Sequence, residues 1–301
     1  MRNSRPDHTP IALLIATLLS GYSPLAAYAK PIVTDGDVSP AVPLSITDDW
    51  SIGGSFYVAR TGTGSLVIQD GAMVRDSNAF VGQEAGSVGT AYVTGTGSTW
   101  TEVGSFFVGN FGTGTVNITD GASVLDRYGY IGDNTGSVGV VNVSGVGSLW
   151  NSSRDLAIAT SGSGTLNIAD GATVSNDFGS IGDDTSGVGV VNITGAGSTW
   201  TNHSDLTIGL IGNGSVTVFD GGKLATAASF IGSFFESTGS VQVSGTGSNW
   251  SATDTVNVGY DGAGTLTLAE AGRLSVQNGA GTLSLGTFAN GAGTLNLGGT
   301  S

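Results

Sequence analysis

Residues 100–149 read WTEVGSFFVGNFGTGTVNITDGASVLDRYGYIGDNTGSVGVVNVSGVGSL, and the chain from about residue 50 onward consists of copies of this unit. A repeat of this regularity indicates an architecture in which each unit packs mainly on its neighbours. Three sets of residues mark the period: Trp50, Trp100, Trp150, Trp200 and Trp250; Gly62, Gly112, Gly162, Gly212 and Gly262; and the Asp-Gly pairs that begin at Asp70, Asp120, Asp170 and Asp220.

The repeating unit is itself double. Residues 114–119 (GTVNIT) resemble residues 139–144 (GVVNVS). The underlying period is therefore about 25 residues, within the range of solenoid repeats. At this step the apolar residues form columns that keep their register along the chain. One column contains Val116, Val141, Leu166, Val191, Val216, Val241 and Leu266, and the other contains Ile118, Val143, Ile168, Ile193, Val218, Val243 and Leu268.

Each unit contains three short segments in which apolar and polar residues alternate, separated by Gly, Asp, Asn and Ser. In one unit we expect strands at Phe106–Gly109, Thr115–Thr119 and Ala122–Leu125. Three strands per coil, stacked along an axis, predict an all-β fold, a single-stranded right-handed parallel β-helix (β-solenoid) with coils of about 25 residues. One coil alone buries too few apolar side chains to be stable, so we expect the coils to fold as an array.

The segment 1–29 has the features of a cleaved signal peptide. Arg2 and Arg5 form a basic start, Ile11–Leu19 is an apolar run, and Ala27-Tyr28-Ala29 places small residues where a signal peptidase cleaves. The apolar run is too short to cross a bilayer, which requires about 20 residues. We therefore expect cleavage after Ala29 and an exported product.

The composition excludes some partners. Removal of residues 1–29, which include Arg2, Arg5 and Asp7, leaves 7 basic and 22 acidic residues and a net charge of −15. Such a surface repels nucleic acid and anionic lipid, so neither is expected as a partner. Gly accounts for 52 of the 301 residues and charged residues for 11%, values that fit neither a helical protein nor a disordered acidic chain.

The repeat pattern divides the chain. Residues 30–49 contain three prolines and none of the repeat columns, and we interpret them as a lead-in and N-terminal cap. Residues 50–278 form the β-helix of double-coil repeats. Residues 279–301 begin further coils, because the stretch GAGTLNLGG at 291–299 has the pattern of a coil that does not close. We expect the chain to be part of a longer protein.

Two columns have competing interpretations. The Trp residues alternate with Val and Leu, which favours a core column of large and small side chains over an exposed ladder that stacks on sugars. Asn117, Asn142, Asn167 and Asn192 each lie between inward-facing residues and therefore point outward. A hydrogen-bonded amide ladder is favoured for them, and a polar face that binds a partner is the alternative.

The Asp-Gly pairs follow the second strand, where both residue types favour a tight turn. Calcium binding would require acidic ligands that converge from adjacent coils, whereas this column recurs only in every second coil, about 10 Å apart. We therefore interpret these aspartates as turn residues, and Asp133, Asp183 and Asp184, in a longer corner loop, in the same way. No metal-ligating residue and no cofactor is expected.

Catalytic constellations are not apparent. His203 is the only histidine after residue 29, there is no cysteine, and the basic residues are scattered. A polysaccharide lyase or hydrolase would need a carboxylate cluster or a basic residue that interrupts the repeat. The visible departures, His203 and Phe234-Phe235, form no recognisable set. We expect no catalytic residue and no enzymatic activity.

The repeated phrases GxGSxW, GxGTVNIxDGA and IGD, followed by GVVNVSGxGSxW, resemble the repeat shared by type V secretion autotransporter passengers and PEP-CTERM-associated proteins. The resemblance covers about residues 50–278. It implies a Gram-negative bacterium, a β-helical passenger outside the cell, and a C-terminal outer-membrane barrel that exports it. No barrel pattern occurs in this chain. The last coils favour the autotransporter group over the PEP-CTERM group.

Three functions are therefore compared. The first is a non-catalytic, surface-displayed passenger that acts in adhesion, aggregation or as a stalk, with a cell-surface ligand or a polysaccharide as partner. The alternatives are a β-helical enzyme acting on polysaccharide, with catalytic residues outside this chain, and an extracellular matrix protein of the PEP-CTERM type. A barrel encoded downstream of Ser301 would support the first.

Overall fold

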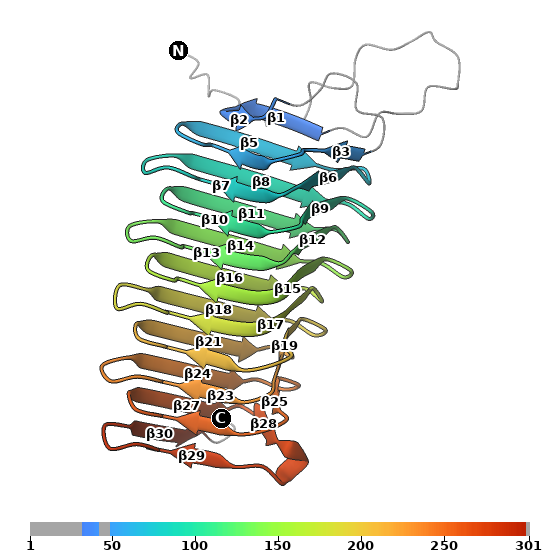
Figure 1. Ribbon diagram of the computed structural model, residues 1–301. Helices are drawn as coiled ribbons and strands as arrows, with labels where there is room; N and C mark the ends of the chain where they lie inside the picture. Colours follow the sequence, from blue (N-terminus) through green and yellow to red (C-terminus); the bar gives the residue numbers. More distant parts are fainter. Residues whose placement is uncertain (1–31, 42–48, 299–301) are drawn as a thin grey trace, which may run out of the picture.

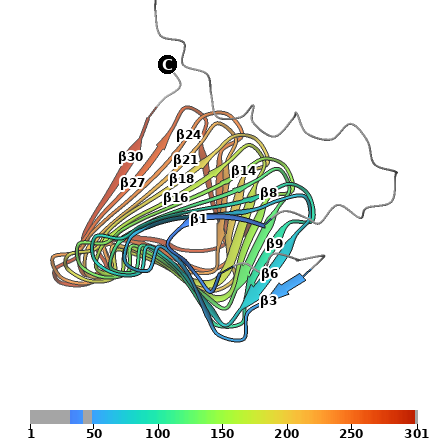
Figure 2. The same cartoon turned by 90° about the horizontal axis from the view of Figure 1, so that it is seen from above.

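The computed structural model describes residues 32–41 and 49–298, which form one elongated stack of β coils (Figure 1). The predicted all-β parallel solenoid is confirmed, with the predicted coil length. Helix is limited, in these two ranges, to a 3-10 turn at Gln277–Gly279. The predicted signal peptide lies outside the described residues. Viewed along the axis, the coils overlie one another in a roughly triangular outline with a gradual rotation from coil to coil (Figure 2).

One strand of each coil belongs to an eleven-stranded sheet, here called the long-strand sheet. It consists of β1 (Ile32–Gly36) and ten parallel strands. Neighbouring parallel strands pair at a constant step up to β27, the step that joins Val116 to Val141. β30 follows after a longer coil, with Leu266 paired to Leu295. The ten strands are β5 (Thr63–Ile68), β8 (Val88–Thr94), β11 (Thr113–Thr119), β14 (Val138–Ser144), β16 (Ser163–Ala169), β18 (Val188–Thr194), β21 (Asn213–Phe219), β24 (Thr238–Ser244), β27 (Ala263–Ala269) and β30 (Ala292–Leu297).

The two shorter strands of each coil form the second, nineteen-stranded sheet, which also includes β2 (Val38–Ser39). In β15 and β17 these two strands are continuous. The members are β3 (Asp49–Ser51), β4 (Ser55–Val58), β6 (Met73–Asp76), β7 (Asn78–Val81), β9 (Thr99–Glu102), β10 (Ser105–Val108), β12 (Ser123–Asp126), β13 (Tyr128–Ile131), β15 (Leu149–Ile158), β17 (Thr173–Ile181), β19 (Thr199–Asn202), β20 (Leu206–Ile208), β22 (Lys223–Thr226), β23 (Ser229–Ile231), β25 (Asn249–Ala252), β26 (Val256–Val258), β28 (Arg273–Val276) and β29 (Leu283–Leu285).

The core contains the columns that the alternation predicts. The predicted inward residues of the long-strand sheet are buried from Val116 to Leu266. Trp100, Trp150, Trp200 and Trp250 are fully buried, and each pairs with Val or Leu of the adjacent coils, as Trp100 does with Val74 and Val124. The core interpretation of the Trp column is thus confirmed. An exposed Trp ladder is excluded.

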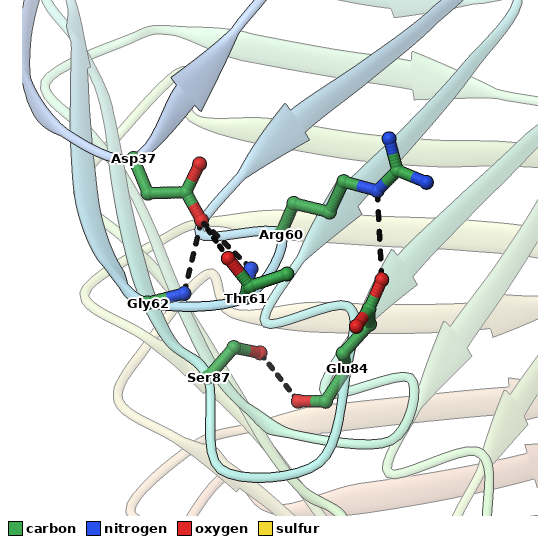
Figure 3. A network of polar contacts seen from close by, with 6 residues as sticks. All are labelled: Asp37, Arg60, Thr61, Gly62, Glu84 and Ser87. Atoms are coloured by element: carbon green, nitrogen blue, oxygen red, sulfur yellow. Dashed lines mark hydrogen bonds and ion pairs between the residues drawn. The ribbon is translucent and has the colours of Figure 1, made fainter.

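The N-terminal segment covers the first coil with antiparallel strands. β1 pairs with β5, and β2 pairs with β4. Between them, the Asp37 carboxylate accepts hydrogen bonds from the backbone N–H groups of Thr61 (2.7 Å) and Gly62 (2.9 Å) (Figure 3). These bonds hold the pKa of Asp37 below its usual value. In later coils a carbonyl of the preceding coil accepts the equivalent bond, as Gly82 does from Gly112, so Asp37 replaces a missing neighbour.

The same region contains an ion pair between Arg60 and Glu84, with 3.5 Å between Nε and Oε1 (Figure 3). Both side chains are more than half exposed. An exposed pair of this kind contributes less than about 1 kcal/mol. The ion pair joins two coils, and the cap is held by its strand pairing and by Asp37.

Candidate functional site

The predicted Asn column is a hydrogen-bonded ladder on the outer face of the long-strand sheet. The side-chain amide of each Asn donates to the side-chain carbonyl of the Asn in the preceding coil, at 2.8–2.9 Å from Asn117 to Asn192. The four side chains are half-buried. The ladder interpretation is confirmed, and it ties four consecutive coils together on the outside of the sheet.

The outer face around this ladder carries no charge. On the ten parallel strands of the long-strand sheet, as far as the structure describes them, every outward side chain is uncharged, and most are Thr, Ser, Val or Asn. Val88, Val138 and Val188 lie in one column and are 40–47% exposed. This face combines hydroxyls, amides and methyl groups on a chain with a net charge of −14. It suits an uncharged partner.

A second outer column, on the short-strand face, consists of four stacked aromatic rings that the sequence analysis did not identify. Tyr57, Phe80, Phe107 and Tyr130 pair in register in consecutive coils. Their ring centroids are 4.8–5.1 Å apart and their planes are within 12° of parallel. Since the rings cover one another's faces, the inner rings offer only their edges to solvent. The stack thus rigidifies the first coils rather than providing a platform for sugars.

The Asp-Gly pairs form tight turns, as predicted. Asp70, Asp120, Asp170 and Asp220 have φ of 52–57°, and the glycine that follows each also has positive φ. The residue after the glycine donates its N–H to the carbonyl of the residue before the aspartate, as Ala122 does to Thr119 at 3.1 Å. Two successive positive φ values define a type I′ turn, which favours Asp-Gly.

The aspartates of the longer corner loop are held by their neighbours. Asp133 Oδ2 accepts hydrogen bonds from the side-chain amides of Asn110 and Asn134, each at 3.0 Å. Ser180 donates to Asp183 at 3.0 Å, while burial raises the pKa of Asp183 to about 6. Ser161 donates to Asp184 at 3.3 Å. These contacts fit the structural role that was predicted for this corner.

Calcium binding is expected to be weak at most. No group of three Asp, Glu, His or Cys side chains with metal-site geometry occurs in the described part of the chain. Titration calorimetry of the full chain should show no tight stoichiometric binding, and a variant with Asp120→Asn and Asp170→Asn should give the same heats as the parent. Tight binding with a large rise in Tm would contradict the assignment of these residues to turns.

The structure does not bring together the two departures from the repeat. His203 is exposed at the bend between β19 and β20. Phe234 and Phe235 lie on another corner, between β23 and β24, and are 54% and 61% exposed. They do not form a common site.

Three carboxylates cluster in the core at positions that the sequence analysis did not identify. Asp76, Glu102 and Asp126 point into the core from consecutive coils and are only 3–5% exposed. The indole N–H of Trp100 donates to Asp76 at 2.7 Å, and that of Trp150 donates to Asp126. Both oxygens of Glu102 lack a hydrogen-bond partner. We call these three residues the acid column.

The acid column is part of a polar line that continues along the core. In later coils Ser152, Asn176, Asn202 and Thr226 occupy the equivalent positions. Trp200 donates to Asn176 at 2.8 Å and Trp250 to Thr226 at 3.1 Å. Each member lies two residues after a Trp, Val or Leu of the Trp column. That spacing places both side chains on one face of a strand, and it is the signal that could have revealed the line.

Burial determines the protonation of the acid column. Loss of hydration raises the pKa of Asp76 and of Asp126 to about 7, in each case against the lowering effect of the indole hydrogen bond. For Glu102, burial and then the charges of Asp76 and Asp126 raise the pKa well above its usual range. The column is enclosed in the core, where each of the three residues is only 3–5% exposed.

Comparisons with protein-family models, curated proteins and solved structures found no match. Among the residues that the structure describes, no helix is long and apolar enough to cross a membrane. The fold and the side-chain columns therefore carry the functional inference.

Proposed function

We propose that this chain is the exported passenger of an autotransporter, a non-catalytic β-solenoid displayed on the cell surface that acts in adhesion, aggregation or as a stalk. The observation that carries the proposal is the uncharged outer face of the long-strand sheet, which continues without interruption over ten parallel strands. At about 4.8 Å per strand the face is about 48 Å long. The repeat resemblance and the predicted signal peptide support export.

The chemistry of this face favours an uncharged ligand such as a neutral polysaccharide. Its hydroxyl and amide groups can exchange hydrogen bonds, and its valine methyl groups can cover apolar edges of a sugar. Elsewhere the acidic surface keeps the rods soluble and repels anionic polymers. A long uniform face binds by summing many weak contacts along the rod, which is an avidity effect.

Surface display is tested by expressing the full-length gene in its own host and adding protease to intact cells. We expect antibodies against the coils to label intact cells, and the protease to remove that label. Retention of the coils inside intact cells would contradict the proposal.

The binding face is tested with paired charge substitutions. Thr115→Asp with Thr165→Asp places two negative charges on the outer face of the long-strand sheet, whereas Thr96→Asp with Ala196→Asp places the same charges at exposed corners. We expect only the first pair to reduce adhesion of cells to one another or to neutral polysaccharide, with unchanged surface levels. Equal adhesion of the two variants would exclude this face as the adhesive surface.

A further inference from the structure

The acid column places three carboxyl groups in adjacent coils with no counter-charge. Asp76 and Glu102 are register partners, and Asp126 follows Glu102 on the next strand of the same ladder. One oxygen of Asp76, one of Asp126 and both of Glu102 have no hydrogen-bond partner. In the described ranges no Lys, Arg or His side chain is buried. The column is therefore unlike a buried ion pair.

The groups that surround the acid column are almost entirely apolar. The inward side chains of β7, β10 and β13 and of the facing strands β5, β8 and β11 are aliphatic or aromatic, or the residue is glycine. Ser152 of β15 is the polar neighbour at the far end. Each of the three carboxyls therefore faces only the other two as titratable groups. Arg75, next to Asp76 in the sequence, and Arg127, next to Asp126, are exposed on the outside of the coils.

Protons are the ligand that this geometry accepts. Strands in a ladder are about 4.8 Å apart, so three ionised carboxylates would repel one another in a medium that hydrates none of them. Bound protons remove the charge and provide O–H donors for the unpartnered oxygens. A cation would need converging ligands, and no such group of three is found in the described residues.

We propose that the acid column of Asp76, Glu102 and Asp126 is a proton-binding site whose occupancy controls the stability of the first coils. These coils are then most stable at acidic pH and become less stable as the pH rises.

The direction of this dependence follows from proton linkage. In the folded chain the pKa values of Asp76 and Asp126 are raised to about 7 and that of Glu102 lies well above its usual range, whereas in the unfolded chain carboxyls titrate near 4. The folded state therefore holds more protons between these values. The stabilisation is complete below pH ~4 and is lost as the pH rises through ~7.

The polar line supplies an internal control. In later coils Asn176 and Asn202 occupy the positions of the acids, and the amide of Asn176 donates to Asn202 at 2.6 Å. Trp200 donates to Asn176 as Trp100 donates to Asp76. Amides thus satisfy the same indole donor without titrating. The stability of these later coils should not depend on this line between pH ~4 and ~8.

The test compares the full chain with a variant carrying Asp76→Asn, Glu102→Gln and Asp126→Asn, in buffers that contain a chelator. We expect the Tm of the parent to fall by about 5 °C or more between pH ~5 and ~8, and that of the variant to fall by much less. Hydrogen exchange, corrected for the intrinsic pH effect, should locate the loss of protection in β6, β9 and β12 and not in β19 and β22.

A reciprocal variant keeps the proposal testable if the triple variant does not fold. Asn176→Asp with Asn202→Asp should introduce a new pH dependence of the protection from hydrogen exchange in β17 and β19, because it creates a pair of buried carboxyls in the same polar line of the core. Equal pH dependence in the parent and the triple variant, or none from the reciprocal pair, would overturn the proposal. A parent pH dependence that appears only with an added divalent cation and disappears with chelator would assign the column to a metal instead.

Discussion

Val141→Asp is expected to destabilise the surrounding coils by about 3 to 5 kcal/mol. Val141 is fully buried on β14, and its register partners in the adjacent coils are Val116 and Leu166. An aspartate there loses the valine contacts and finds no hydrogen-bond donor in its column. It must either bury an unpaired charge or take up a proton, and both cost free energy of folding. Denaturant unfolding, with hydrogen exchange to locate the effect, measures it.

Asn142→Thr is the matched control for this substitution. The Asn142 side chain points outward and is half-buried. The substitution removes the hydrogen bond that its amide donates to Asn117 and the one that it accepts from Asn167. Thr217 occupies the same column further along the sheet, so threonine fits the position. We expect a cost below about 1 kcal/mol. A larger cost for Asn142→Thr than for Val141→Asp would mean that the two faces are exchanged.

The acid column does not weaken this prediction, because the two columns differ in their partners. Asp76 and Asp126 each receive an indole N–H from the Trp of the next coil. Val141 instead belongs to the aliphatic column of the long-strand sheet, whose inward neighbours offer no donor side chain. The same carboxyl is therefore tolerated in one column and strongly destabilising in the other.

Gly139→Ala is expected to destabilise the array by about 3 kcal/mol or more. A β-carbon at Gly139 would lie 2.2 Å from the Val108 carbonyl oxygen and 2.5 Å from the Gly132 nitrogen. Both are backbone atoms of the ladder, so neither can move without breaking coil-to-coil hydrogen bonds. The free energy of unfolding by denaturant measures the loss. The same close approach recurs at Gly114 and Gly239, which explains the glycine at this point of each long strand.

Gly54→Ala separates this steric effect from the general effect of replacing glycine. No atom lies within 4 Å of the β-carbon position at Gly54, and its φ is outside the left-handed region. We expect its effect to stay within about 0.5 kcal/mol. Equal effects of the two alanines would show that the contact at Gly139 is relieved by a shift of the coil.

Most of the fold is predictable from the sequence because the sequence itself repeats with two periods. One is the two-residue alternation along each strand, and the other is the step of about 25 residues from coil to coil. Alternation along each strand assigns Val141 and Asn142 to opposite faces, and the constant step between long strands superimposes both on the next coil. Predicted strand positions lie close to the observed ones, as for Ala122–Leu125 against Ser123–Asp126. The Asn ladder follows from the same two periods, and the buried Trp column follows from the alternation of Trp with Val and Leu.

The acid column and the aromatic stack depended on the tertiary structure, because the steps along these columns are uneven and no single residue type recurs along the whole chain to mark them, as Trp marks the Trp column. The step from Asp76 to Glu102 is longer than the step from Glu102 to Asp126. In the same way, the step from Phe80 to Phe107 is longer than the step from Phe107 to Tyr130.

The corner before the first short strand and the bend between the two short strands both differ in length between successive coils, so a constant step aligns the long strands and misses these neighbours. The sequence by itself determined the coil, its faces and its register on the long-strand sheet, whereas the bends of the folded chain decided which short-strand side chains meet.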